Sequence, residues 1–164
     1  MTEIDQLAED VARRLVARGE SIAVAESAAG GRISAALLGV AGASAYFKGG
    51  VVVYTTEGKE RLAGMTPDAL QSHRSATAPH TVLLARAIRE RLGATWGIAE
   101  TGAAGPTGNR YGDAAGHAAL AVVGPIERTA VIETGQSERR QNMEGFALAA
   151  LRLLSTTLQE QPPS

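Results

Sequence analysis

Hydrophobic residues recur along the chain with two periodicities, one typical of amphipathic helices and the other of short buried strands. Near the start, helical spacing links the apolar residues Ile4, Leu7, Ala8, Val11 and Leu15. Thr2 is placed to cap this helix and Gly19 to end it. The next segment, SIAVAE at 21–26, is short, apolar and partly β-branched, which predicts a buried strand. A helix is expected to open at the two glycines that follow.

The same patterns predict the remaining elements. Helices are expected over 57–62, 66–70, 79–93 and 137–159. Strands are expected over 49–56, 95–101, 118–123 and 128–134, and the turn GPIE joins the last two as a hairpin. Strands that alternate with helices before a hairpin indicate an α/β fold, a three-layer helix–mixed sheet–helix single domain. We expect this domain to span residues 1–164, with a frayed tail over 160–164.

Composition narrows the class of protein. The 164 residues are 45% hydrophobic and 20% charged, which is typical of a globular chain and not of a disordered one. The net charge is −1 and basic residues are scattered, so neither nucleic-acid binding nor membrane binding is expected. The absence of cysteine excludes disulfides, thiolate metal sites and a cysteine nucleophile. Because no long apolar run or signal-like start is present, a cytoplasmic protein is expected.

Ser27 is the first candidate for chemistry. It lies in the segment A-E-S-A-A-G-G, directly after a predicted strand and before Gly30 and Gly31, which open a helix. Free N–H groups at a helix start bind developing negative charge, so a serine here suits a nucleophile beside an oxyanion site. Serine in this position also commonly caps a helix. Spacing alone leaves both interpretations open.

A serine nucleophile needs a base, and the sequence offers two kinds. His80 and His117 fall at the starts of a predicted helix and a predicted strand, and no Ser-His-Asp order stands out. Tyr54 lies near the end of the strand over 49–56 and Lys59 begins the turn after it, so both could lie at the same sheet edge as Ser27. A lysine acts as a base only where burial or a neighbouring cation lowers its pKa. The alternative is a solvated lysine and a packed tyrosine.

A glycine-rich loop, T-G-A-A-G-P-T-G-N-R, covers residues 101–110. Its backbone amides suit a phosphate, and Arg110 could add a bidentate contact. The loop is neither a Walker A loop nor a dinucleotide-binding fingerprint. A Tyr-Lys reductase is also discounted, because Tyr54 and Lys59 are five positions apart, where that class has four, and because the fingerprint is absent.

Three segments in order carry a resemblance to a known family. These are AESAAGG, then VAGASAYFKGGVVVYTTEGK at 40–59, then ETGAAGPTG at 100–108. Together they resemble the CinA C-terminal domain family, and the likeness extends over nearly the whole chain. Members are often fused to a second, N-terminal domain, and this chain resembles the stand-alone form. The resemblance implies a homodimer or higher homo-oligomer.

The resemblance also implies an activity. Family members deamidate nicotinamide mononucleotide to nicotinate mononucleotide and ammonia, in pyridine-nucleotide salvage, with no metal and no cofactor. By position, Ser27 would attack the carboxamide carbon, and Lys59 and Tyr54 would assist proton transfer. The residues implied in holding this small-molecule nucleotide are Gly30, Gly31, Thr101, Gly102, Ala104, Gly105 and Arg110.

The chain departs from the family near the site. Ala28 and Ala29 replace the Cys and Thr of E-S-C-T-G-G, Glu100 replaces an apolar or hydroxyl residue, and 113–117 replaces Lys-Pro-Val-Gly-Thr. Carboxylates at Glu100 and Asp113 would disfavour a phosphate if they faced the site, unless they pair with Arg110 or Arg32. Two alternatives therefore stay open. One is a non-catalytic relative that binds a nucleotide or a protein, and the other is a Ser-Lys enzyme in which Glu100 selects a different amide.

Overall fold

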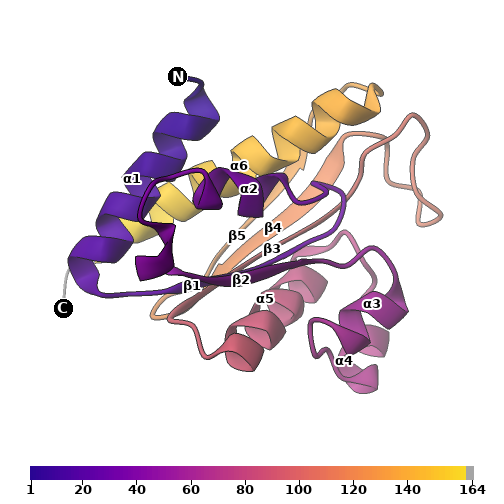
Figure 1. The fold of residues 1–164 in the computed structure, drawn as a ribbon. Helices are drawn as coiled ribbons and strands as arrows, with labels where there is room; N and C mark the ends of the chain where they lie inside the picture. Colours follow the sequence, from indigo (N-terminus) through magenta and orange to yellow (C-terminus); the bar gives the residue numbers. More distant parts are fainter. Residues whose placement is uncertain (162–164) are drawn as a thin grey trace.

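Five strands form one mixed sheet in the order β2-β1-β3-β4-β5, with helices on both faces (Figure 1). This computed structural model describes residues 1–161. The strands are β1 Ile22–Glu26, β2 Phe47–Val52, β3 Trp96–Ala103, β4 His117–Val123 and β5 Arg128–Glu133. β1 pairs in parallel with β2 and β3, whereas β4 runs antiparallel to β3 and β5. The predicted three-layer α/β class and its hairpin are confirmed.

Each face of the sheet has its own helices (Figure 1). The helices are α1 Glu3–Arg18, α2 Arg32–Leu38, α3 Thr56–Arg61, α4 Pro67–Ser72, α5 Ala78–Leu92 and α6 Arg139–Glu160, with a short 3₁₀ turn at Ala43–Ala45. α1, α2 and α6 cover one face, and α3, α4 and α5 lie on the other (Figure 1). Threonine hydroxyls accept an N–H bond at the starts of four of these helices: Thr2 for α1, Thr55 for α3, Thr66 for α4 and Thr77 for α5.

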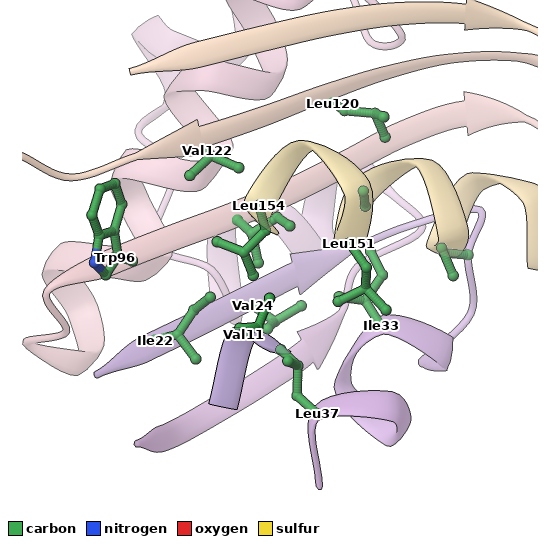
Figure 2. Packing of buried hydrophobic residues seen from close by; sticks show 14 of the residues in the cluster. Val11, Ile22, Val24, Ile33, Leu37, Trp96, Leu120, Val122, Leu151 and Leu154 are labelled. Atoms are coloured by element: carbon green, nitrogen blue, oxygen red, sulfur yellow. The ribbon is translucent and has the colours of Figure 1, made fainter. Parts of the chain in front are cut away.

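The larger of two apolar clusters lies between the sheet and α1, α2 and α6. Figure 2 shows Leu151 and Leu154 of α6 directed onto Val24 of β1, beside Ile33 of α2. The second cluster lies under α5 and is rich in alanine. A Cβ added at Gly97 of β3 would overlap the Ala85 carbonyl oxygen of α5, so the small strand residue allows the helix to approach closely.

Several predicted boundaries differ from the structure. The strand expected over 49–56 is β2 at 47–52, and Tyr54 lies beyond its end. The Val53 amide makes the last bond to β1, at the Glu26 carbonyl. The chain then leaves the sheet because Thr55 caps α3. The frayed tail expected over 160–164 is wrong for Glu160, which ends α6, and residues 162–164 lie outside the described part of the chain.

The parallel strands bring their carboxyl ends to one edge of the sheet. Ser27 follows β1, Tyr54 follows β2, and Thr101 lies near the end of β3. Crevices outside the carboxyl ends of parallel strands are the usual binding sites of open α/β sheets.

Candidate active site

A pocket of about 500 Å³ opens at this edge of the sheet. Its walls include six of the predicted site residues, namely Ser27, Tyr54, Lys59, Thr101, Gly102 and Arg110. Among the described residues, Gly30, Gly31, Ala104 and Gly105 are not part of the lining. The structure therefore brings together the three predicted catalytic residues and three of the predicted binding residues.

Ser27 does not cap α2, and two buried carboxylates organise its turn. Glu26 accepts bonds from the Gly31 and Ile33 amides, so it supplies the helix cap. Glu100 Oε1 accepts from the amides of Ser27 and Ala29 at 3.0 and 2.9 Å. The interpretation of Ser27 as a helix cap is therefore wrong, and Ser27 is one of the residues that line the pocket.

The glycines after Ser27 turn the chain and do not offer oxyanion donors. The Gly30 amide donates to the Ser27 carbonyl at 3.1 Å, and the Gly31 amide donates to Glu26 at 2.9 Å. Both residues have positive φ, +66° and +95°. A Cβ at Gly30 would lie 2.6 Å from the end of the flexible Met143 side chain, so the positive φ is what favours glycine here.

Lys59 is buried although it carries an amine. It belongs to α3, only 4% of it is exposed, and its Nζ donates to Ser75 Oγ at 2.8 Å. A second contact, 2.9 Å long, joins Nζ to His80 Nε2. Burial lowers the pKa of Lys59 to about 8, although the charge of Glu100 opposes this shift. A lysine in this state can give and take a proton near neutral pH.

His80 is a buried, neutral partner of Lys59. Burial, together with the Lys59 charge, lowers the pKa of His80 to about 4. His80 Nδ1 lies 3.1 Å from the His73 carbonyl oxygen, which can only accept a hydrogen bond. The ring proton is therefore on Nδ1, and Nε2 offers a lone pair to Lys59.

Tyr54 lies at the mouth of the pocket. Its side chain is 64% exposed, and its phenol oxygen accepts a bond from Arg139 Nη2 at 3.1 Å. The alternative of a packed tyrosine beside a solvated lysine is therefore wrong for both residues, since the lysine is the buried one.

The loop predicted over 101–110 begins later than expected, because residues 101–103 belong to β3, where they pair with β4. The Thr101 hydroxyl accepts from the Ala76 amide at 3.1 Å and bonds to the Thr81 hydroxyl at 2.8 Å. A Cβ at Gly102 would lie 2.7 Å from the His117 carbonyl oxygen, so close packing requires glycine there. Thr101 and Gly102 thus shape the pocket wall.

The next part of the loop is tied to α6. The Ala104 carbonyl accepts from Asn142 at 2.8 Å, and the Gly105 carbonyl accepts from Arg139 at 2.6 Å. A Cβ at Gly105 would approach the Ser137 carbonyl oxygen to 2.7 Å. Ala104 and Gly105 thus fix the path of the loop, although neither residue lines the pocket.

Neither of the unexpected carboxylates pairs with Arg110 or Arg32. Asp113 binds Arg74 through two bonds of 2.7 and 3.1 Å, which lower the pKa of Asp113 to about 2. Glu100 is fully buried under the Ser27 turn. The expected pairing is therefore wrong, because the partners are Arg74 and backbone amides.

Arg110 lies at the pocket wall and is exposed to solvent. Its guanidinium donates to the Tyr111 phenol at 2.8 Å and lies 5.0 Å from the centre of that ring. Within residues 1–161, no carboxylate forms a salt bridge with it.

Residues 1–161 contain neither a group of metal ligands nor a membrane-spanning helix. In the described part of the chain, no group of three or more His, Cys, Asp or Glu residues is arranged to hold a metal ion. No helix over residues 1–161 is long and apolar enough to cross a membrane.

Comparison with known proteins identifies the family. The model of the CinA C-terminal domain matches residues 4–158. The chain belongs to the CinA C-terminal domain family. A CinA-like protein of Anaeromyxobacter sp. (strain K) is 39% identical over 154 residues, covering 94% of this chain and 38% of that protein. A CinA-like protein of Salinibacter ruber is 38% identical over 144 residues, 88% of this chain and 35% of that protein. The chain thus spans less than two fifths of these curated relatives.

Solved CinA structures share the fold over nearly their full length. A CinA superfamily protein from Klebsiella pneumoniae 700603 superposes with a TM-score of 0.89 at 27% identity, covering 96% of this chain and 99% of that one. The competence/damage inducible protein CihA from Agrobacterium tumefaciens gives 0.88 at 26% identity, with 97% of each chain covered. The predicted CinA C-terminal-like fold is confirmed.

Sequence patterns did not reveal Ser75 and His80 as partners of Lys59. His80 is 21 positions from Lys59 and on another helix, so no local spacing connects them. A histidine on the first turn of a helix that follows a cap at Thr77 was the only available signal.

Proposed function

We propose that this CinA-family domain is a metal-independent amidohydrolase that converts nicotinamide mononucleotide to nicotinate mononucleotide and ammonia. The observation that carries the proposal is the placement of Ser27 and the buried Lys59 in one pocket. Because burial brings the pKa of Lys59 to about 8, a useful fraction of the amine is neutral at physiological pH.

In the proposed reaction, neutral Lys59 takes the Ser27 hydroxyl proton as Oγ attacks the carboxamide carbon. The tetrahedral intermediate collapses when the amide nitrogen receives the proton held by the Lys59 ammonium, either directly or relayed through the Tyr54 phenol, which is reprotonated by Lys59. Ammonia then leaves and Lys59 is neutral again. Water then attacks the acyl-serine ester, with neutral Lys59 as base. This step releases the carboxylate product and restores the Ser27 hydroxyl.

The pocket mouth suits a nucleotide. Arg110 offers a guanidinium to a phosphate. Tyr54 and Tyr111 place aromatic rings in the pocket walls, where a pyridine ring could stack. Glu100 is fully buried and bonded to the Ser27 turn, so it does not support the alternative in which this carboxylate selects a cationic substrate. Homo-oligomer formation and a cytoplasmic location stay predictions.

Ammonia release from nicotinamide mononucleotide tests the proposal directly. We expect turnover by the wild-type chain and a loss of at least about a thousandfold in Ser27→Ala, because the attacking atom is removed. Ser72→Ala is the matched control, since that exposed hydroxyl bonds to the Ala69 carbonyl on α4, outside the pocket lining. Full activity in Ser27→Ala would exclude the nucleophile. Saturable nucleotide binding without turnover by the wild type would favour a non-catalytic relative.

A further inference from the structure

The Lys59 amine is held by two uncharged groups. Ser75 Oγ and His80 Nε2 lie 2.8 and 2.9 Å from Nζ, on different segments of the chain. A lysine ammonium has three N–H donors and no acceptor. These contacts use two of the donors, which leaves one for the pocket that Ser27 also lines.

We propose that His80 is a positioning residue, whose Nε2 lone pair holds the Lys59 amine in the pocket and stabilises the ammonium formed when Lys59 takes the Ser27 proton. The inference rests on the proposed function and extends it to a residue that is not itself part of the pocket lining. His80 acts only through Lys59.

The ring orientation of His80 is determined by the backbone. Its Nδ1 faces the His73 carbonyl at 3.1 Å, and the side chain is only 2% exposed. With the proton on Nδ1, Nε2 can accept and cannot donate. If the ring proton were on Nε2, that N–H and an N–H of the Lys59 ammonium would both be donors across the 2.9 Å contact. The His73 carbonyl therefore makes His80 an acceptor.

The neutral state of this acceptor matters as much as its position. A carboxylate at position 80 would form an ion pair, raise the pKa of Lys59 and keep it protonated. A neutral imidazole holds the amine in either protonation state. The titratable groups that act on the pair are Glu100 of β3, whose charge raises the pKa of Lys59, and His73 after α4, whose charge lowers the pKa of His80.

Four variants test the role by steady-state kinetics across pH. In His80→Leu the ammonium loses an acceptor, so we expect kcat to fall by about tenfold to a hundredfold with little change in KM. The acid limb of kcat/KM, which reports Lys59 in the free enzyme, should move to lower pH. His80→Gln keeps an acceptor oxygen and should restore part of kcat, whereas His80→Glu should move the acid limb to higher pH. Ser72→Ala is the control, because that exposed hydroxyl bonds to the Ala69 carbonyl on α4 and contacts neither Lys59 nor His80.

A wild-type kcat and an unmoved acid limb in His80→Leu would overturn the proposal. Nitrogen NMR of the wild-type protein at pH 7 provides a test that needs neither activity nor a folded variant. We expect a protonated Nδ1 and an unprotonated Nε2 for His80, and a proton on Nε2 would overturn the proposal. If the wild type releases no ammonia, the proposed function fails, while the NMR result still decides whether His80 accepts from Lys59.

Discussion

Two buried carboxylates lie side by side under the Ser27 turn and have different surroundings. Glu26 and Glu100 are partners in the register of β1 and β3. Glu26 receives donors on both oxygens, from the Gly31, Ile33 and Ser34 amides and the Ser34 hydroxyl. Glu100 receives both of its bonds on Oε1, and in the described chain its buried Oε2 has no partner. The surroundings of Glu100 therefore favour a proton on this carboxyl group.

Glu100 should make stability depend on pH. Burial and the Glu26 charge raise the pKa of Glu100 to about 7, against 4.5 for the unperturbed group, although the amide bonds oppose this. Between these values the folded state keeps a proton that the unfolded chain has lost, so the free energy of unfolding should fall as pH rises from 4.5 to 7 and level off above 7. In Glu100→Gln this contribution should be absent.

Urea unfolding at pH 5 and pH 8 measures the effect. The variant Glu60→Gln makes the same chemical change at an exposed position and is the control. An identical pH dependence in the wild type and in Glu100→Gln would show that Glu100 is not the titrating group.

At the scale of residues, the sequence was sufficient to predict candidate site residues that lie in family motifs. It was not sufficient to predict side-chain partners that meet only through tertiary contacts. Ser27 and Lys59 were found because their segments recur together in one family. The partners of Lys59 were missed because Ser75 and His80 meet it only after α3 packs beside the start of α5. Glu100 was noticed as a charge, but its bonds go to backbone amides, which no side-chain pattern reveals.

At the scale of elements, the helix ends that depend on a capping threonine or glycine could be predicted from the sequence. Thr2 and Gly19 bound α1 as expected, Thr66 caps α4, and Gly93 ends α5 with a positive φ. The end of β2 was not predictable from β-branched residues alone. Thr55 favours a strand by composition, yet its hydroxyl accepts the Gly58 amide and begins α3.

The contact between β3 and α5 predicts a contrast between two glycine substitutions. In Gly97→Ala the new Cβ would overlap the Ala85 carbonyl oxygen and lie 2.9 Å from Arg89 Cβ, so we expect a loss of about 1–3 kcal/mol. Gly145→Ala is the control, because that site in α6 has an ordinary contact at 3.8 Å. Helix propensity should there add about 0.5–1 kcal/mol of stability. Denaturant midpoints measure both, and equal effects would contradict the close packing of β3 on α5.

At the scale of the whole molecule, the sheet separates most of the core from the site. The larger cluster lies between the sheet and α1, α2 and α6 (Figure 2), whereas Lys59 and His80 belong to α3 and α5 on the opposite face (Figure 1). The layers followed from the alternation of strands and helices. The strand order did not, because it depends on how β2 and β3 both pair with β1.

This separation predicts that stability and turnover respond independently to a core change. Leu151 is fully buried against the sheet on the α6 face, so Leu151→Ala should lower the free energy of unfolding by about 2–5 kcal/mol. Well below its unfolding midpoint, the variant should keep nearly the wild-type kcat for ammonia release. Leu38→Ala, at an exposed position, should leave both quantities nearly unchanged. A parallel loss of kcat and stability in Leu151→Ala would show that the two faces are coupled.

The exposed Arg110 and Tyr111 can be substituted more freely than the buried Lys59 and its partners, Ser75 and His80. Arg110 contacts Tyr111, and the centre of the Tyr111 ring also lies 5.1 Å from the Arg74 guanidinium. Neither Arg110 nor Tyr111 contacts Lys59 or its two partners, so replacing them leaves the Lys59 contacts in place. On the proposed function, a library randomised at these two positions would therefore vary substrate preference while Lys59 and its partners stay unchanged.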